Sequence, residues 1–418
     1  MLFRSLSLVS CDKDEENVTP MSSEPTKNNI VQLAQENGFN ALAAALTRAG
    51  LVEALQADGS FTVFAPTDEA FDGLLEAVGQ QSIDDVPVEV LQQVLLYHVI
   101  PSKVMSSQMT AGDFITLEGS SVNLGLMDGV SVNDAMVQAP FDVEASNGVI
   151  HTVDQVLVPA SVAQFVNTVL EPAYFNNNFT SLIAAAAKAD LVATLLNTPN
   201  LTIFAPTNRA FESAGIVIMD TPKETLASVL TYHVIGAKVM STDITREAVS
   251  LNSNKLFFTF SDAGAYINGN AMISYVDITS GSGVVHVIDQ VLLPPNGNLV
   301  ETAVSLSELG EFSSLVAALQ RTVNEGSPEQ NLINVLSSDG PFTIFAPNNI
   351  AFQQLLNSRG DWNTLGDIPL ETLISVLSYH VVPARAYDKD LASALQNGQL
   401  PTALGTNINV DLNTLRIN

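Results

Sequence analysis

The chain is poor in several residue types, and each shortage excludes a class of protein. Its 418 residues include one cysteine, so an internal disulfide framework is excluded. No apolar run approaches the roughly 18 residues that a membrane-spanning helix needs. Basic residues are scarce as well, with 16 Lys and Arg against 44 Asp and Glu and a formal charge of −28. A surface this acidic repels phosphate backbones, so nucleic acid is not expected as a partner.

Hydrophobic residues, by contrast, are abundant. They make up 46% of the chain, which supports packed cores and excludes a mainly disordered protein. The acidic excess is uneven: residues 30–160 hold 2 basic and 17 acidic side chains, residues 161–296 hold 6 and 10, and residues 297–418 hold 5 and 12. We interpret this charge as a solvated surface. The alternative is bridging by divalent cations to another acidic surface.

The single cysteine lies near the N-terminus. "SLVSC" ends at Cys11 and resembles the lipobox of bacterial lipoproteins, in which this cysteine is lipidated. Residues 12–27 are polar and have the composition of a flexible tether. The segment 13–15, Lys-Asp-Glu, resembles the signal that sends some lipoproteins to the outer surface. We therefore expect an acidic lipoprotein of the cell envelope, at the outer membrane and surface-exposed, that meets the membrane only through its lipid anchor.

Residues 1–11 are read as the remnant of a lipoprotein signal peptide. Ten residues precede Cys11, with Arg4 as the sole charge, whereas a signal peptide has an apolar core of about 7–15 residues behind a basic start. We expect the true start to lie upstream. The alternative is a chance cysteine in a disordered terminus.

Three short segments recur along the chain. The first is found three times: "FTVFAPTDEAF" (61–71), "LTIFAPTNRAF" (201–211) and "FTIFAPNNIAF" (342–352). The second is found three times: "LLYHVIPSKV" (95–104), "LTYHVIGAKV" (230–239) and "LSYHVVPARA" (377–386). The third is found twice: "NGVIHTVDQVLVP" (147–159) and "SGVVHVIDQVLLP" (282–294). A period near 140 residues is domain-sized, far above the roughly 20–50 residues of a solenoid repeat.

The histidine spacing defines the repeats. All five histidines lie in these segments, and the same 53 residues separate His98 from His151 and His233 from His286. The same count from His380 passes Asn418, so we expect the third repeat to lack its last strand and the chain to end inside a domain. The predicted domains are a first repeat (28–160), a second repeat (161–296) and a truncated third repeat (297–418).

Each repeat combines helical patterns with later strand patterns. Residues 40–55 and 180–196 are rich in Ala and Leu at helical spacing. The apolar run "FTVF" predicts a strand that ends at Pro66, and Thr67 can cap the next helix, with Asp68 in its first turn. Strand-like segments with turn residues follow, and "GVIHTVDQVLVP" closes the repeat. Helices followed by strands predict an α+β fold.

These segments resemble the fasciclin domain. Its pattern is Phe-Thr-hydrophobic-Phe-Ala-Pro-Thr, then Tyr-His before hydrophobics, then Val-Ile-His-x-Ile-Asp-x-Val-Leu-Leu-Pro. The resemblance implies tandem wedge-shaped β-sandwiches flanked by helices, and an extracellular adhesion or matrix role without catalysis or a cofactor. Gly236 departs from the proline usual after the Tyr-His segment, and Asn348 departs from the usual threonine. A missing last strand would expose sheet edges in the third repeat.

Paired histidines also permit a metal or hydrolytic site, formed for example by His98 and His151 or by His151 and Asp154. No third ligand of the right kind stands nearby, and no catalytic or phosphate-binding motif is present. We therefore expect no enzyme, metal or cofactor, and buried imidazoles bonded to neighbouring backbone or to hydroxyls such as those of Tyr97 or Thr152. The predicted structural residues are Pro66, Thr67, Asp68, His151, Asp154, Pro206, Thr207, His286, Asp289 and Pro347.

The resemblance gives the Tyr-His pairs a second interpretation. In animal fasciclin proteins this pair is implicated in integrin contact, which points to Tyr97, His98, Tyr232, His233, Tyr379 and His380 as interaction residues. The alternative is that these pairs lock helix to sheet. A further Arg-Gly-Asp tripeptide at 359–361 is explained as a local loop. The expected partner is a cell-surface or matrix protein or a polysaccharide of unknown identity, and the alternative is an envelope component that only self-associates.

Overall fold

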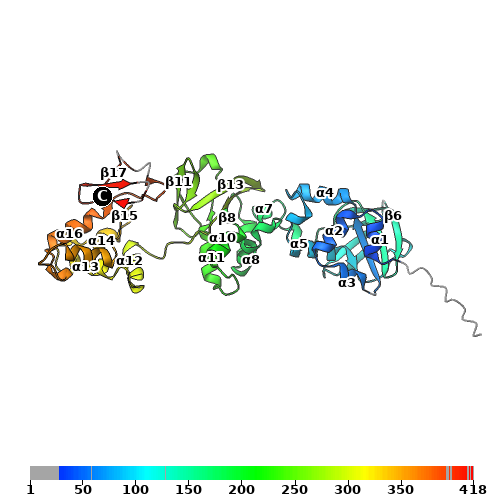
Figure 1. Cartoon of the computed structure of the whole chain (residues 1–418). Coiled ribbons are helices and arrows are strands. Elements are labelled where there is room, and N and C mark those ends of the chain that lie inside the picture. The colour runs from blue at the N-terminus through cyan, green and yellow to red at the C-terminus, as the bar shows by residue number, and fades with distance from the viewer. Residues whose placement is uncertain are drawn as a thin grey trace, which may run out of the picture. The chain divides into compact units, whose positions relative to one another are not determined.

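A computed structural model of the chain describes residues 28–57, 59–127, 129–391, 395, 398–411, 414 and 416–417. Cys11 and the predicted tether lie outside these residues. Helices and sheets are grouped in each of the three repeats (Figure 1). Within the described residues, no helix has both the length and the apolar character needed to span a bilayer.

The first repeat opens with short helices and closes with a sheet. Its helices are α1 (Ile30–Glu36), α2 (Asn40–Arg48), α3 (Val52–Gln56), α4 (Asp68–Ala77), η1 (Ile83–Asp85), α5 (Val88–Tyr97) and η2 (Ser106–Gln108). Its strands are β1 (Phe61–Pro66), β2 (Val99–Ile100), β3 (Gly112–Ile115), β4 (Ser121–Gly125), β5 (Ser131–Val132), β6 (Ala135–Ala145) and β7 (Gly148–Val153).

The predicted helix over residues 40–55 is two helices. The first, α2, buries Leu42 and Leu46 on one face, as the Ala/Leu pattern predicts. Gly50 then has a positive φ of 68°, a backbone conformation that ends a helix. In the second repeat Asp190 has a similar φ of 54° at the matching place. The pattern therefore predicted the buried face correctly and missed the break.

The last strand of the first repeat lies in the middle of its sheet. The strand order is β2-β1-β7-β6-β5-β4-β3. Strands β1 and β7 are parallel, with Phe61 opposite Gly148 and Pro66 opposite Val153, and the other pairs are antiparallel. All six residues of β7 are buried, which explains why its sequence is mostly apolar rather than alternating.

The long strand β6 bends where its register with β7 shifts, between Gln138 and Val143. This bend lets the sheet fold back over its own apolar face. Residues from both halves of the sheet therefore meet in one core, which contains Phe64, Tyr97, Ile100, Met109, Val122, Leu124, Val132, Ala135, Val153 and Leu157.

The second repeat has the same architecture. Its helices are α6 (Ala160–Ala163), α7 (Glu171–Tyr174), η3 (Asn177–Phe179), α8 (Thr180–Lys188), α9 (Val192–Asn197), α10 (Asn208–Ser213), α11 (Lys223–Tyr232) and η4 (Ser241–Asp243). Its strands are β8 (Thr202–Pro206), β9 (Val234–Ile235), β10 (Glu247–Val249), β11 (Lys255–Ser261), β12 (Gly264–Ile267), β13 (Ala271–Ser280) and β14 (Gly283–Ile288). The order β10-β11-β12-β13-β14-β8-β9 places β14 beside β8, in parallel, as β7 lies beside β1.

In the described part of the third repeat, the helices are present and the strands form two separate sheets. Its helices are α12 (Leu299–Glu308), α13 (Ser313–Asn324), η5 (Pro328–Gln330), α14 (Leu332–Leu336), α15 (Asn349–Asn357), η6 (Leu365–Asp367) and α16 (Leu370–Tyr379). Its strands are β15 (Thr343–Ile344), β16 (Val381–Val382), β17 (Gln399–Pro401), β18 (Asn407–Asp411) and β19 (Arg416–Ile417). They form a β15-β16 pair and a separate β17-β18-β19 sheet.

The predicted α+β class is confirmed, since helices and sheets make up every repeat. In the third repeat, no described strand takes the place that β7 and β14 hold in the other two. Strand β15 accordingly has two residues where β1 has six, and it pairs with β16 alone among the described residues.

Candidate functional site

The first Tyr-His pair joins a helix to the sheet. His98 directly follows α5 and is 1% exposed. Its Nδ1 lies 2.7 Å from the carbonyl of Val94, and its Nε2 accepts a hydrogen bond of 2.8 Å from the backbone N–H of Leu157. Because Nε2 accepts, the proton sits on Nδ1, which donates to Val94, and the imidazole is neutral. The last turn of α5 is thereby tied to the chain that follows β7.

Protonation of this histidine is unfavourable. Burial lowers the pKa of His98 to about 4, although the Val94 carbonyl opposes the shift. A second ring proton would point at the N–H of Leu157 and leave two donors facing each other. His233 repeats the arrangement with Val229 and Leu292 at the same distances, and burial lowers its pKa to about 4 too.

The hydroxyl of the tyrosine in this pair also makes its hydrogen bonds within the repeat. The Tyr97 hydroxyl donates to the carbonyl of Ser121 at 2.9 Å and accepts from Nδ2 of Asn133 at 3.1 Å. Tyr232 makes the same contacts with Lys255 and Asn268. Both asparagines have positive φ, which asparagine tolerates well in turns. Their shared spacing of 36 residues from the tyrosine is the sequence signal that would have revealed them.

The second histidine of the first repeat lies in β7 and anchors the bulge of β6. His151 is fully buried, and its Nε2 lies 2.9 Å from the carbonyl of Val104. Its Nδ1 accepts from the N–H of Asp142 at 3.3 Å. Burial lowers the pKa of His151, and its bond to Val104 and the Asp142 carboxylate oppose that shift. The two contacts hold a strand, a loop and a bulge around one ring.

Asp142 connects this ring to a serine. Its carboxylate accepts from the backbone N–H of Ser106 at 2.7 Å and from the Ser106 hydroxyl. Burial raises the pKa of Asp142, but the hydrogen bonds from Ser106 outweigh it, so the pKa is lowered overall. The second repeat has the same network. The Asp277 carboxylate accepts from the backbone N–H of Ser241 at 2.7 Å and from its hydroxyl at 2.5 Å, and the backbone N–H of Asp277 donates to Nδ1 of His286 at 3.2 Å.

Serine, aspartate and histidine together do not form a catalytic triad here. In a triad the histidine lies between the other two and takes the proton of the serine. In this network the aspartate lies between them, and both nitrogens of each of the four histidines in the first two repeats are in hydrogen bonds. No nitrogen is left to act as a base or metal ligand. Among the described residues, no three His, Cys, Asp or Glu are grouped to hold a metal ion.

A threonine of the first recurring segment supports the same region. The Thr62 hydroxyl donates to the carbonyl of Ser102 at 2.6 Å and accepts from the N–H of Val104 at 2.8 Å. The carbonyl of Val104 then receives the proton of His151. Thr202 and Thr343 make the matching pairs of bonds. Sequence analysis did not single out this threonine, although it occupies the second position of all three segments.

The predicted structural residues lie at corners between strands and helices. Pro66 and Pro206 are the last residues of β1 and β8, and Pro347 follows β15. The Thr67 hydroxyl accepts from the N–H of Ala70 at 3.2 Å. In the same position, Thr207 accepts from Ala210 at 3.3 Å and Asn348 accepts from Ala351 at 3.0 Å. The three repeats thus share one helix cap.

Two acidic positions have partners that the sequence did not reveal. Asp68 lies in the first turn of α4, but its carboxylate accepts from the N–H of Ala41 at 2.9 Å and so caps α2. Asn208 and Asn349 make the equivalent bond in the other repeats. Asp154 and Asp289 each accept a backbone N–H at 2.7 Å, from Met136 and Met272 respectively, and fasten the chain after the closing strand to its neighbour.

The third Tyr-His pair is only partly buried. The Tyr379 hydroxyl donates to the carbonyl of Asn407 at 3.2 Å, and Nδ1 of His380 lies 2.8 Å from the carbonyl of Val376. No described residue donates to Nε2 of His380. Direct contact of the three Tyr-His pairs with a partner stays a prediction, and in the first two repeats the pairs are buried.

The Arg-Gly-Asp tripeptide lies on an exposed turn after α15. The guanidinium carbon of Arg359 lies over the ring of Trp362, 5.3 Å from its centroid. Trp362 itself packs against the helical core of the third repeat. The arginine thus has a stacking partner within its own loop.

Comparison with known proteins establishes the family. The fasciclin domain matches residues 37–159, 177–294 and 310–418, which is most of the chain. The chain therefore belongs to the fasciclin domain family, as a tandem of these domains, and the resemblance noted in its sequence is confirmed.

Relatives come from animals and bacteria. The transforming growth factor-beta-induced protein ig-h3 of Sus scrofa is 28% identical over 85% of this chain and 49% of its own length. Periostin of Homo sapiens is 30% identical over 72% of this chain and 35% of its own length. Protein sll1483 of Synechocystis is 43% identical over 31% of this chain and 73% of its own length. The chain spans about half or less of the length of the animal relatives it matches.

Among solved structures, the chain is similar to a FAS1 domain pair from the insect cell adhesion molecule fasciclin I. The sequence identity is 18% and the TM-score is 0.27, with 62% of this chain and 98% of that chain covered.

Proposed function

We propose that this protein is a non-catalytic adhesion protein that presents tandem fasciclin domains outside the cell. Fasciclin domains occur in cell adhesion proteins. The observation that carries the proposal is the internal use of all four histidines of the first two repeats and of the tyrosines that precede two of them. Four histidines and two tyrosines are buried in the same networks twice, so they build the fold and supply no chemistry to a substrate.

Because those rings are buried, we expect exposed side chains to make the contact with a partner. The bulges of β6 and β13 carry apolar residues outward, next to the aspartates that are held inward. Phe141 precedes Asp142 and is 52% exposed, and Val276 precedes Asp277 and is 47% exposed. Tyr275 is 69% exposed at the same bulge. Large apolar side chains fixed outward by a rigid network are suited to an interface.

The expected partner is a cell-surface or matrix protein or a polysaccharide. Repeated domains on one chain allow several weak contacts to add through effective concentration. The acidic surface, which is strongest in the first repeat, favours a basic partner or one bridged by divalent cations. Lipidation of Cys11 would hold the protein at the cell envelope and leave the repeats exposed.

Adhesion can be tested with the whole chain immobilised on beads. We expect saturable binding to cells, extracellular polysaccharide or matrix protein, and at least a tenfold loss of affinity in a Phe141→Ser, Tyr275→Ser, Val276→Ser variant. A Val217→Ser, Met219→Ser variant is the matched control, because these residues are 58% and 81% exposed elsewhere. Binding to none of these targets, or equal loss in both variants, would refute the proposal.

Anchoring needs a separate test. Metabolic labelling with a fatty-acid analogue in a Gram-negative host is expected to mark the wild-type chain and not a Cys11→Ser variant. Equal labelling of the two chains, or none, would refute lipidation at Cys11 without bearing on adhesion.

A further inference from the structure

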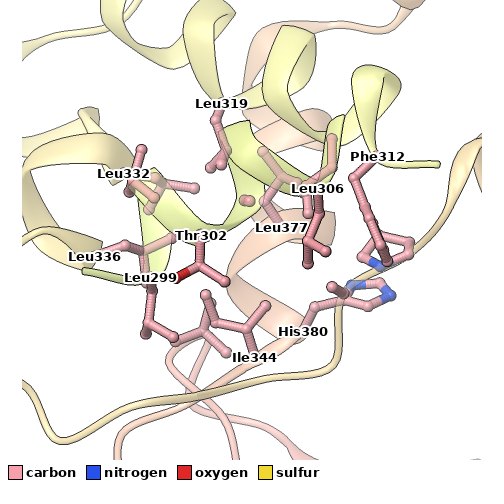
Figure 2. Close-up of a pocket in the computed structure, with 16 residues that line it drawn as sticks. Leu299, Thr302, Leu306, Phe312, Leu319, Leu332, Leu336, Ile344, Leu377 and His380 are labelled. Atoms are coloured by element: carbon pink, nitrogen blue, oxygen red, sulfur yellow. The ribbon is translucent and has the colours of Figure 1, made fainter. Parts of the chain in front are cut away.

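The third repeat contains an apolar groove of about 190 Å³. Leu299, Leu306, Leu336 and Leu377 point into one common space, and His380 lies at its edge (Figure 2). The groove borders β15, and the first two repeats place their closing strands β7 and β14 beside the matching strands β1 and β8. Because a strand of the same chain takes this place in the fold, we assign the groove no separate ligand.

The first repeat has an open strand edge of another kind. Strand β3 is last in the order of its sheet, and among the described strands it pairs with β4 alone. Across this pair the N–H of Thr116 donates to the carbonyl of Ser120 at 3.0 Å. Successive residues of an antiparallel strand direct their backbone groups to opposite sides, so Asp113 and Ile115 direct theirs away from β4. No described residue bonds to the outward N–H and carbonyl groups of these two residues.

The open edge ends at Leu117. The N–H of Leu117 also points away from β4, and it donates to the carbonyl of Val99 in β2 at 2.8 Å. Strand β2 therefore closes the sheet on this side, and an added strand can reach Asp113 and Ile115. The side chain of Ile115 is 65% exposed, and Asp113 is exposed too. Free backbone groups beside an exposed β-branched side chain are what the addition of a strand requires.

The second repeat repeats this edge and partly neutralises its charge. Strand β10 carries Glu247 and Val249 at the matching positions, and Val249 is 56% exposed. The N–H of Leu251 donates to the carbonyl of Val234 at 2.8 Å, as Leu117 does to Val99. The Glu247 carboxylate accepts from Nζ of Lys255 at 3.1 Å. This acidic side chain therefore already has a cationic partner.

The third repeat closes the same edge with a proline. The N–H of Ala403 donates to the carbonyl of Val381 at 2.7 Å, which is the role of Leu117 in the first repeat. Pro401, two residues earlier in β17, therefore has the place of Ile115. Proline has no N–H to give to an added strand, and it is one of the ways in which proteins block a strand edge. The first two repeats keep the donor that the third lacks.

Charge decides what can occupy the edge of β3. The Asp113 carboxylate accepts from the neutral amide of Asn123 at 2.7 Å, and no described cation forms an ion pair with it. Residues 30–160 hold 2 basic and 17 acidic side chains. A second copy of this chain would bring the acidic edge of its own β3 or β10 against Asp113, and like charges on paired strands repel. A strand that carries basic side chains gains from the same field.

We propose that the edge of β3 binds an extended segment of a basic polypeptide as an added antiparallel strand. An aliphatic residue of this segment lies opposite Ile115, and a Lys or Arg two residues later lies opposite Asp113. Each of these two residues exchanges N–H and carbonyl hydrogen bonds with the residue it faces. The edge of β10 is the weaker site, because Lys255 already pairs with Glu247. The adhesive function proposed above rests on other residues, so either proposal can fail alone.

The test uses the full chain and a fluorescent peptide of the sequence Thr-Val-Thr-Lys-Thr-Val-Thr-Lys-Thr. We expect saturable binding by fluorescence anisotropy, which weakens as salt is added. The same peptide with glutamate for lysine should not bind. Amide hydrogen exchange, followed by NMR, should slow at Asp113 and Ile115 in the complex, because their N–H groups become hydrogen-bonded. A peptide that is attracted only by the acidic surface would not slow exchange at these two positions.

A charge reversal has a matched control in the same repeat. Asp113→Lys should weaken binding of the lysine peptide by at least about tenfold and should let the glutamate peptide bind. Asp134→Lys changes the net charge by the same amount at another exposed position, and it should leave binding of the lysine peptide nearly unchanged. Far-UV circular dichroism checks that both variants keep their secondary structure.

A proline substitution tests the backbone contacts separately from charge. Ile115→Pro copies Pro401 and removes one outward N–H, so it should weaken binding of the lysine peptide by about tenfold. Val249→Pro makes the same change in β10 and should leave the tighter binding in place. No binding of the lysine peptide, equal losses in Asp113→Lys and Asp134→Lys, or binding without slower exchange at Ile115 would overturn the proposal.

Discussion

Among the described residues, the first two repeats have seven strands each and the third has five, and none of those five takes the place of the closing strand. With β7 or β14 in place, the sheet is continuous, both tyrosine-histidine networks are closed and the helix at the start of the repeat is buried. In the third repeat the described strands form two small sheets, and a helix and a strand edge line an open groove. A strand that is last in sequence and central in space therefore joins the two halves of this fold.

The largest expected consequence concerns the stability of the third repeat. Each buried aliphatic side chain of a strand such as β7 contributes about 1.5–3 kcal/mol to the free energy of unfolding. We therefore expect the free energy of unfolding of the third repeat to be several kcal/mol lower than that of the other two. Trp362 is the only tryptophan and packs against the core of the third repeat. In urea, its fluorescence should change at a lower midpoint than the far-UV circular dichroism. Coincident midpoints would show that the groove costs no stability.

Acid should act on the first two repeats through His98 and His233. Their folded pKa of about 4 lies below the ordinary value of 6.5, so the unfolded state binds protons more tightly between these values. The stability they confer is full above pH 6.5 and is lost as the pH falls toward 4, by roughly 3 kcal/mol for each histidine. Urea unfolding followed by circular dichroism at pH 7, 5.5 and 4.5 measures this. His98→Gln, His233→Gln should be less stable at pH 7 and should flatten the dependence, and an unchanged slope would contradict the assignment.

A change at the strand junction tests whether close packing of β7 holds the first repeat together. A Cβ on Gly148 would lie 2.2 Å from the carbonyl oxygen of Phe61, whereas a Cβ on Gly73 meets no atom within 4 Å. Gly148→Ala should lower the free energy of unfolding of that repeat by about 3 kcal/mol through overpacking. Gly73→Ala, in helix α4, should be neutral or stabilising by up to about 1 kcal/mol. Equal changes in the free energy of unfolding for Gly148→Ala and Gly73→Ala, measured in urea, would show that β7 can shift to accommodate the added methyl group.

Removing the side chain that caps the helix should have the smallest effect on stability, and the effect should be the same in all three repeats. Thr67→Ala, Thr207→Ala and Asn348→Ala each remove one side-chain acceptor at a helix start. Each should cost about 1 kcal/mol, measured by urea unfolding, and Asn348→Asp should keep most of the stability that Asn348→Ala loses. A much larger loss at Asn348 would mean that the cap of the third repeat also supports the groove.

Features set by neighbouring residues were predictable. Thr67, Pro66 and the Ala/Leu faces of α2 and α8 follow from local rules for caps, strand ends and helical spacing. The structural use of the histidines was expected too, and of the two kinds of partner expected, backbone groups and hydroxyls, the structure shows backbone groups. Sequence analysis missed Asp142 and Ser106 because they are 36 residues apart and meet only when β6 bends.

By itself, the sequence determined the number of repeats, their family and the residues that begin and end their helices and strands, because short recurring segments contain the residues on which each of these depends. Only the tertiary structure decided that the closing strand lies beside the first one, that Asp68 caps another helix, and that one repeat presents an open groove. These depend on contacts between residues far apart in the chain, whose choice of partner is settled by burial and hydrogen bonding when the whole repeat packs.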